Sequence, residues 1–574
     1  MNFLEAAWQS FLHTIDSGTV AGDNGWTLRI LMLLVTLSGI FIVSILIGSI
    51  TSGLEAKLED LRKGRSKVLE NNHTLILGWS SKIFSIISEL VIANENQKNP
   101  RIVILAPKDK VEMEDEIRSR QPCTKNSKII CRTGSPLDLT DLDVASPNEA
   151  RSIIVLSPDG EDADTDVIKT ILALTNSPER NGKKFHIVAE IRNAENIEAA
   201  ELVGRDEATL VLSSDLIAKV TAQTCRQSGL SMVYTELLDF DGAEIYFAKE
   251  PALNGKTYRD ALFGYETSTV MGIRKVSGEI LLNPDMSTLI EQTDQLIVIS
   301  LDDDTVTFSK APEIPERGVS PEIAKDGPGG ERTLILGWNE RGASIIQELD
   351  NYVGKGSEVL IMADTPTVRL EIEHLQTIIY NNTLQFREGN ICDRKTLDSV
   401  SVGSFDHIII LCYQNLDVQQ ADAKTLIALL HLRNISEQQG KDFSIVSEML
   451  DIKNRDLAQV AKADDFIVSD KLVSLMLSQL SENAELKKVF DQLFTSEGSE
   501  IYLKPIEYYA SVGEETNLYN LVDSAAQRGE TFLGYKTHAL AHDPKSAYGV
   551  FVNPNKSSKV TFSKEDRVIV LSEN

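Results

Sequence analysis

Cysteine and histidine are scarce in this chain, and neither is spaced like a set of ligands. The 574 residues include only five cysteines, without a C-x-x-C pair, and eight scattered histidines. A disulfide framework or a zinc site needs paired or closely spaced ligands, so we expect neither. We interpret the cysteines as reduced thiols of cytosolic domains: Cys123, Cys131, Cys225, Cys392 and Cys412.

Basic residues are outnumbered, with 57 Lys and Arg against 85 Asp and Glu and a net charge of −28. Nucleic-acid phosphates repel such a chain, so we expect no nucleic-acid partner, whereas a solvated assembly or divalent cations fit this charge. Catalytic motifs are lacking as well, because no nucleophile elbow or pair of catalytic carboxylates stands in a recognisable frame. We therefore expect no enzyme, and an NAD-dependent activity ranks last among the hypotheses.

Charge is absent from residues 30–50, ILMLLVTLSGIFIVSILIGSI, a run of 21 residues. About 20 apolar residues cross a bilayer as one helix. A buried soluble helix would show a polar face, and a signal peptide would be shorter and nearer the N-terminus. We predict a membrane span. The basic residues that follow it place the long C-terminal part in the cytoplasm by the positive-inside rule: Lys57, Arg62, Lys63, Arg65 and Lys67.

The segment before that run, residues 1–29, is typical of a channel pore. Residues 2–13 have apolar side chains at helical spacing, and a polar, turn-rich stretch follows. Tetrameric cation channels build pore helix, selectivity filter and inner helix in this order. The alternative is a helix and loop outside the membrane, ahead of a single anchor. The predicted filter residues are Thr14, Ile15, Asp16, Ser17, Gly18 and Thr19.

The predicted inner helix contains two glycines and leads into a polar connector. Gly39 and Gly48 are candidate gating hinges, although glycine is frequent in transmembrane helices in any case. Residues 51–71 carry leucines at helical spacing and predict a linker helix between the membrane and the soluble part.

The soluble part is an internal repeat. HTLILGWS at residues 73–80 returns as RTLILGWN at residues 332–339, a separation of 332 − 73 = 259 residues. Short apolar runs alternate with helical segments in both copies, which predicts α/β units with doubly wound parallel sheets. We expect Rossmann-like N-lobes at 72–242 and 331–498, each followed by a small α+β C-lobe at 243–308 and 499–574. A Pro/Gly-rich linker at 309–330 joins the two halves.

The first strand–helix turn of each unit has a degenerate nucleotide motif. Dinucleotide folds use G-x-G-x-x-G, because the middle glycine lets the backbone approach the pyrophosphate. The first copy keeps only Gly78, and the second keeps Gly337 and Gly342. Asp364, at the end of the second strand of the second unit, has the position of a ribose ligand. Since most of the glycines are missing, we do not expect NAD.

An acidic run, DGEDADTD at residues 159–166, is the most distinctive local chemistry. Its clustered oxygens suit Ca²⁺, with Asp159, Glu161 and Asp162 as candidate ligands, but the spacing is not that of an EF-hand. The alternative is a solvated helix N-terminus, where the helix dipole favours acidic residues.

The chain resembles the Castor/Pollux ion channel family. The resemblance lies in DLRKGRS at 60–66, NHTLILGWS at 72–80, IANE at 92–95 and the second LGWN copy, and it covers nearly the whole chain. It implies a homotetrameric cation channel in which each subunit brings two regulator-of-K⁺-conductance (RCK) domains to a cytosolic gating ring. It also implies Ca²⁺ as the associated ion, with Glu190 in the place of a carboxylate ligand in related rings.

The chain also departs from the family. It matches the family filter at Asp16 to Gly18 but continues Thr19-Val20, it lacks T-V-G-Y-G, and the family's further spans do not precede its pore helix. An outer helix would come from upstream sequence or another chain. Two hypotheses follow: a Ca²⁺-regulated cation channel subunit, or a membrane-anchored RCK-type nucleotide-sensing regulator of a potassium transport system without its own pore.

Overall fold

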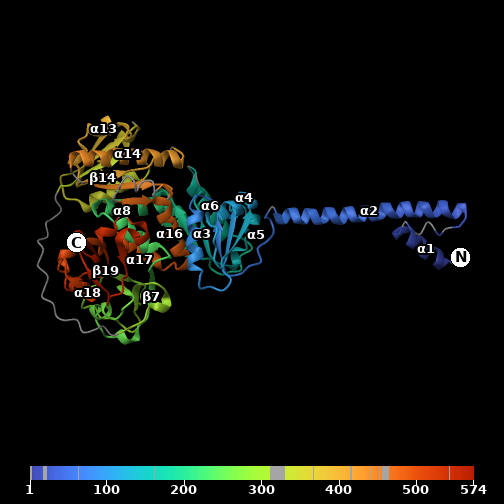
Figure 1. Ribbon diagram of the computed structural model, residues 1–574, viewed down its shortest axis with the longest axis horizontal. Coiled ribbons are helices and arrows are strands. Elements are labelled where there is room, and N and C mark those ends of the chain that lie inside the picture. The colour runs from blue at the N-terminus through green and yellow to red at the C-terminus, as the bar shows by residue number, and fades with distance from the viewer. Residues whose placement is uncertain are drawn as a thin grey trace.

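The computed structural model has a long helix that projects from an α/β body (Figure 1). The structure describes residues 3–16, 18, 22, 24–62, 64–158, 160, 162–309, 330–365, 367–413, 416–440, 443–451, 453–454, 465–541 and 543–573. Nearly all of the predicted linker at 309–330 lies outside these described residues.

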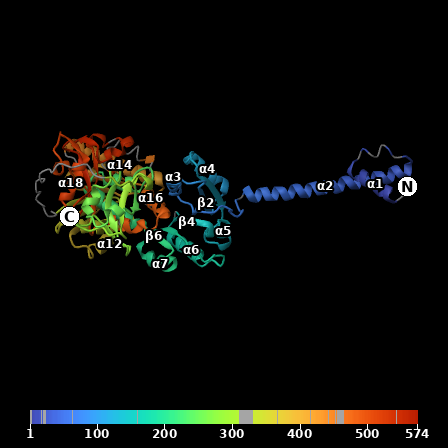
Figure 2. The ribbon, with the colours of Figure 1, turned by 90° about the horizontal axis from the view of Figure 1, so that it is seen from below.

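Two helices form the N-terminal part. α1 (Phe3–Ile15) lies beside the far end of α2 (Trp26–Arg62), and α2 leads directly toward the body (Figures 1 and 2). The candidate span in α2 covers 30 residues, Trp26–Glu55, contains an 18-residue stretch with a mean hydropathy of 2.9, and is long enough to cross a membrane. α2 is continuous for 37 residues, so the predicted span at 30–50 runs without a break into the predicted linker helix at 51–71, and the helix ends at Arg62.

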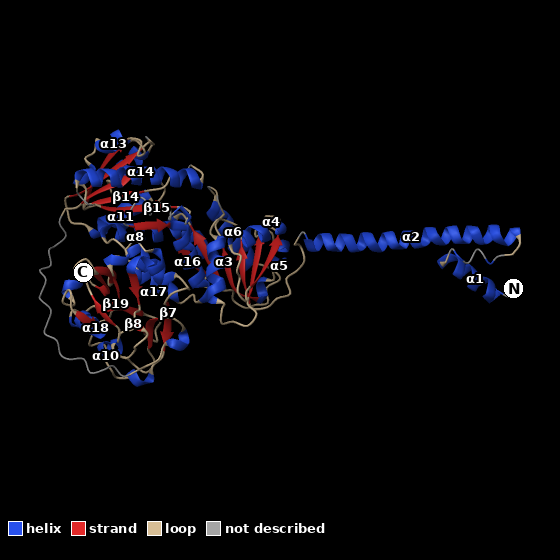
Figure 3. Cartoon of the chain, viewed as in Figure 1, coloured by secondary structure: helices blue, strands red, loops and turns tan. Residues whose placement is uncertain are grey.

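The first predicted Rossmann-like unit is confirmed as a six-stranded parallel sheet with the order β3-β2-β1-β4-β5-β6. Its central strands are fully buried apolar runs, as expected for a sheet covered on both faces (Figure 3). The elements are β1 (His73–Leu77), α3 (Ile83–Ala93), β2 (Arg101–Ala106), α4 (Lys110–Arg120), β3 (Lys128–Thr133), α5 (Leu139–Val144), β4 (Ala150–Val155), α6 (Ala163–Thr175), β5 (Ile187–Ile191), α7 (Ile197–Gly204) and β6 (Ala208–Leu212).

The second unit repeats this order as β13-β12-β11-β14-β15-β16, again with parallel strands. Its elements are β11 (Arg332–Leu336), α11 (Gly342–Tyr352), β12 (Ser357–Ala363), α12 (Val368–Leu375), β13 (Asn382–Glu388), α13 (Arg394–Asp398), β14 (His407–Ile410), α14 (Val418–Gln439), β15 (Ser444–Met449) and β16 (Asp465–Val468).

Each unit is followed by a C-lobe built on a four-stranded antiparallel sheet, with orders β7-β10-β8-β9 and β17-β22-β19-β20. The two C-lobes share one apolar core and a hydrogen-bonded contact between Tyr258 Oη and Thr531 Oγ1 at 2.8 Å. Their elements are β7 (Glu244–Ala248), α10 (Tyr258–Leu262), β8 (Thr269–Arg274), β9 (Ile280–Leu282) and β10 (Gln295–Ser300), then β17 (Glu500–Pro505), β18 (Glu515–Asn517), α18 (Leu518–Gln527), β19 (Thr531–Lys536), β20 (Val550–Val552), β21 (Lys559–Thr561) and β22 (Arg567–Ser572).

The two units exchange the helices that follow their sheets. α8 (Ser213–Arg226) of the first unit packs on α11 and on β14 to β16 of the second unit. α16 (Ser469–Glu482) packs in return on α3 and on β4 to β6 of the first. Both helices are buried nearly all round, and a single apolar cluster contains residues of both units. The halves are therefore locked to each other through the exchanged helices.

Candidate functional site

The C-terminal end of α1 packs against the middle of α2. A Cβ on Gly39 would overlap the backbone of Thr14, whereas nothing lies within 4 Å of the same position at Gly48. Met32 and Thr36, two turns and one turn before Gly39, are buried at this contact. Gly39 thus allows the close approach of two helix backbones. Both glycines were predicted as hinges, and α2 stays helical at each of them.

The predicted filter begins inside α1. Thr14 and Ile15 are the last residues of that helix, so the expectation that the helix ends at residue 13 was wrong, because the i→i−4 bonding pattern continues to Asp16 N and Leu12 O at 2.8 Å. Beyond it, Asp16 Oδ1 accepts a hydrogen bond from Gly18 N at 2.8 Å and orders the turn. Ser17 and Thr19 lie outside the described residues.

The depth of this turn follows from helix geometry. Gly39 stands 39 − 26 = 13 residues after the start of α2, which corresponds to roughly 20 Å at 1.5 Å per residue. α1 therefore lies beside the first half of α2 and ends near the middle of the apolar span (Figure 1). The carbonyl groups at the C-terminal end of a helix carry partial negative charge, and the C-terminal end of α1 lies near the middle of the apolar span.

The first nucleotide-type turn is filled by the chain's own side chains. Gly78 has φ 101°, and a Cβ there would lie 3.1 Å from the Leu156 carbonyl oxygen. Lys82 is buried, with Nζ 3.2 Å from Glu190 Oε2 on β5 and 3.7 Å from Asp470 Oδ1 on α16. Glu190, a predicted metal ligand, thus supplies the negative charge that a pyrophosphate brings to such turns.

The second nucleotide-type turn contains an equivalent buried ion pair, and its carboxylate accepts more hydrogen bonds. Arg341 forms an ion pair with the buried Glu448 on β15. Burial opposes the charge on Arg341, but Glu448 raises the pKa of the guanidinium above its usual value. Asn339 Nδ2 and Ser469 Oγ also donate to this carboxylate, at 2.8 and 2.7 Å.

Gly337 and Gly342 are explained by packing. A Cβ on Gly342 would lie 2.7 Å from the Trp338 ring, and a Cβ on Gly337 would overlap the Leu411 carbonyl oxygen. The sequence analysis missed the ion pairs, although a signal was present: the basic residues recur at 341 − 82 = 259, the repeat distance.

The candidate ligands of the acidic run are not brought together with Glu190 by any described contact. Asp159 and Glu161 lie outside the described residues, and Asp162 precedes α6 without a side-chain cap hydrogen bond. Asp164 is buried and accepts from Arg192 N and Asn193 N at 2.8 and 2.9 Å, so it is structural.

Asp364, the candidate ribose ligand, lies beside a cation. Its Oδ2 is 3.5 Å from Lys424 Nζ, and that ammonium also stands over the Tyr413 ring. Burial and the nearby Asp364 raise the pKa of Tyr413 above its usual range.

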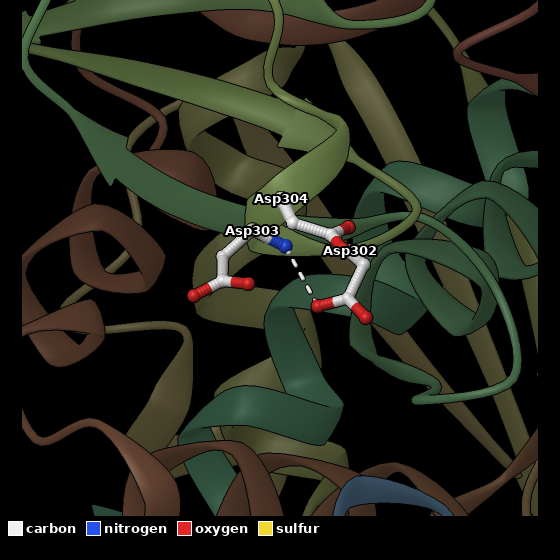
Figure 4. Close-up of side chains that lie close together, drawn as sticks. All are labelled: Asp302, Asp303 and Asp304. Atoms are coloured by element: carbon white, nitrogen blue, oxygen red, sulfur yellow. Dashed lines mark hydrogen bonds between the residues drawn. The ribbon is translucent and has the colours of Figure 1, made fainter. Parts of the chain in front are cut away.

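One further acidic group follows β10 (Figure 4). Asp302, Asp303 and Asp304 place one carboxylate oxygen each within 4.8 Å of one another. Asp302 accepts from Asp303 N at 2.8 Å and from Asn96 Nδ2 at 2.9 Å, and Asp303 and Asp304 are exposed. These bonds order the turn, and we assign it no ligand.

Comparison with known proteins identifies the family. One family model, described as Castor and Pollux, part of voltage-gated ion channel, matches residues 214–315, and a calcium-activated potassium channel slowpoke-like RCK domain matches residues 69–188. The ion channel CASTOR of Lotus japonicus is 33% identical over 608 residues, which cover 99% of this chain and 70% of that protein. The probable ion channel CASTOR of rice is 32% identical over 612 residues, with 100% and 67% covered.

The fold comparison agrees with the RCK assignment. The human SLO3 gating ring aligns with a TM-score of 0.62 and 12% identity, over 87% of this chain and 99% of that one. The predicted tandem RCK architecture is confirmed, and the expectation that the protein is no enzyme is confirmed by its relatives. The chain belongs to the Castor/Pollux family of ion channels.

Proposed function

We propose that this chain is a subunit of a ligand-gated cation channel whose RCK domains form a gating ring around a central pore. The re-entrant arrangement of α1 against α2 carries this proposal. A short helix that lies beside an apolar span and ends at its mid-depth is the arrangement a pore needs. It would serve no purpose in a simple anchor.

The proposed filter comprises Thr14 to Thr19, with Asp16 as its charged member. The carbonyl end of α1 and the Asp16 carboxylate both place negative charge at the turn. Such a turn attracts cations and repels anions. Basic residues after α2 support a cytoplasmic ring, because positively charged flanks stay on that side.

Repeated surface leucines support a homotetramer. Leu172 on α6 and Leu430 on α14 are 47% and 53% exposed, and their separation of 430 − 172 = 258 equals that of Glu190 and Glu448. The same apolar position is therefore open on both units of one chain. Head-to-tail contact between unlike units of neighbouring chains covers both and closes into a ring.

Ca²⁺ is the proposed ligand in preference to a dinucleotide. Lys82 with Glu190 and Arg341 with Glu448 fill the two turns where a pyrophosphate would bind. Titration calorimetry of the purified protein is expected to give no heat of binding with NAD. Saturable NAD binding would contradict this part of the proposal.

Cation flux into liposomes tests the pore. Wild-type protein is expected to conduct cations, with a rate that changes on adding Ca²⁺, and Asp16→Ala is expected to alter the preference between cations. Absence of flux from folded, inserted protein would sink the channel proposal and favour the anchored regulator.

Two glycine variants provide a matched pair for the same assay. Gly39→Ala is expected to reduce flux severalfold, because its Cβ overlaps the Thr14 backbone and displaces α1. Gly48→Ala adds the same methyl group where nothing lies within 4 Å, so its flux should equal that of wild type. Equal flux from both variants would contradict the placement of α1 against α2.

The ring is tested by the mass of the detergent-solubilised protein. Leu172→Glu and Leu430→Glu are each expected to lower the mass from four chains toward one, because a charge enters an apolar contact. Leu370→Glu is the control, since Leu370 is 71% exposed on α12 and has no part in the proposed interface. A tetramer that withstands both changes would refute this interface.

A further inference from the structure

A cavity of about 770 Å³ opens between the two units, lined by β6 and α8 of the first and by α17 (Leu486–Leu493) of the second. We call it the open groove. Its floor is apolar and buried, formed by Leu216, Met476, Phe490 and Phe494. Its volume falls within the range of small-molecule sites, which are often found at domain interfaces.

The repeat places a second, smaller groove at the equivalent position, and a segment of the second C-lobe occupies part of it. This plugged groove, about 440 Å³, is lined by β16 and α16 of the second unit and by α9 (Leu230–Leu238) of the first. The segment η9 (Pro544–Gly549) of the second C-lobe forms its remaining wall. There Ala547 and Tyr548 have φ values of 45° and 55°, a left-handed conformation that costs energy in residues other than glycine.

The difference between the grooves lies in one connection of the C-lobes. β19 and β20 are joined by residues 537–549, and Tyr548 packs from that connection against the apolar core. In the first C-lobe, β8 and β9 are joined by only residues 275–279. The first connection touches its groove at the rim, where the Gly278 carbonyl oxygen lies 3.2 Å from Lys488 Nζ. The plugged groove therefore indicates what the open groove accommodates: a flat ring against an apolar floor.

The charge around the open groove points to an anion. In a chain of net charge −28, this groove is lined by five cations and four carboxylates. Three cations have carboxylate partners: Lys219 with Asp215, Arg274 with Glu485, and Lys487 with Asp491. The other two, Arg205 and Lys488, are exposed, and Lys488 Nζ lies 3.2 Å from the Gly278 carbonyl oxygen at the rim. β6 is the last strand of its sheet, so its outer edge offers backbone donors and acceptors to a ligand.

We propose that the open groove binds a small aromatic anion, with the ring on the apolar floor and the phosphate or carboxylate at Lys488. Such a ligand touches β6 and α8 of the first unit and α17 of the second. Its binding therefore couples to the relative position of the two units, independently of any ion bound elsewhere.

Titration calorimetry of the full-length protein in detergent tests the site. Adenosine monophosphate supplies a ring with phosphate, and indole-3-acetate supplies a ring with carboxylate. At least one is expected to bind with a Kd below about 1 mM. Lys488→Glu is expected to weaken that binding by about tenfold or more, and Thr209→Trp, which fills the groove from the edge strand, should abolish it.

Lys545→Glu is the matched control, because Lys545 lines the plugged groove and the variant makes the same charge change there. It should leave the Kd unchanged. The proposal is overturned if neither probe binds saturably to wild type at about 10 mM, or if Thr209→Trp and Lys488→Glu bind as wild type does. It is also overturned if Lys545→Glu weakens binding as much as Lys488→Glu. Liposome flux is measured separately, so failure of this site and failure of the pore are distinguishable.

Discussion

The two RCK units contain the same buried ion pair but support it unequally. In the second unit, Glu448 accepts from Arg341, Asn339, Ser469 and the Cys412 backbone, the last at 3.2 Å. In the first unit, Glu190 contacts Lys82 at 3.2 Å. There Ser80 and Ser157 replace Asn339 and Cys412. Among the described residues, neither serine hydroxyl has a hydrogen-bond partner, although both are buried.

This difference indicates different roles for the two units. A fully hydrogen-bonded buried charge fixes one arrangement of the surrounding strands and helices, whereas a partly satisfied one is cheaper to rearrange. The looser cluster belongs to the unit that follows α2 directly (Figure 1). We infer that the second unit serves as the rigid support and that the first is the unit that moves when the pore opens.

The largest predicted effect comes from removing the cations. Arg341→Met leaves Glu448 buried with an uncompensated charge and should destabilise the second unit by about 3–5 kcal/mol. Lys82→Met should cost at least as much, because Glu448 keeps the donors Asn339 and Ser469 when Arg341 is lost, whereas no such donor to Glu190 is found among the described residues. Thermal unfolding followed by tryptophan fluorescence measures both, since Trp79 and Trp338 lie in the two turns.

The control for this pair is Arg341→Met combined with Glu448→Gln. Removing both charges should recover much of the stability that the single change loses, because no unpaired charge is left. A clearly smaller loss in Lys82→Met than in Arg341→Met would show that the two clusters do not differ as inferred.

A second prediction concerns introducing into the first unit the amide side chain that the second unit has at Asn339. Ser80→Asn should supply the amide donor that Asn339 gives to Glu448 and so stabilise the protein by about 1 kcal/mol. The reverse change, Asn339→Ser, should cost about 1–3 kcal/mol, because a buried carboxylate loses its partner. If the first unit is the mobile one, Ser80→Asn should also reduce Ca²⁺-dependent flux while Asn339→Ser does not.

The sequence predicted the repeat, both sheets and both C-lobes, because buried parallel strands leave short apolar runs that are visible in one dimension. It could not predict the helix exchange. The sequence of α8 has the same apolar face whether the helix covers the sheet of the first unit or the sheet of the second unit. Periodicity predicted a helix beyond residue 50 but did not show that this helix ends at Arg62 and not at residue 71.

The candidate sites were predicted less completely for a related reason. The filter was predicted from the order of its segments, but the contact of Thr14 with Gly39 depends on how two helices pack. Glu190 was predicted as a metal ligand from its place in the family. Its pairing with Lys82 joins residues 190 − 82 = 108 positions apart, and only the sheet order of β1, β4 and β5 brings them together.

The smallest predicted effect compares the C-lobes by their pH dependence. Burial raises the pKa of Glu244 on β7 from 4.5 to about 7, and burial also raises the pKa of its counterpart Glu500 on β17. A folded-state pKa above the unfolded value means that the folded protein holds the extra proton. This contribution to stability is fully present below about pH 4.5 and is lost as the pH rises through about 7.

Glu244→Gln should therefore flatten the dependence of Tm on pH between about pH 5 and pH 7.5, by a few degrees at most because Glu244 is only partly buried. Glu500→Gln tests whether the second C-lobe responds in the same way. A Tm profile of Glu244→Gln that is parallel to wild type across this range would assign the pH dependence to other groups.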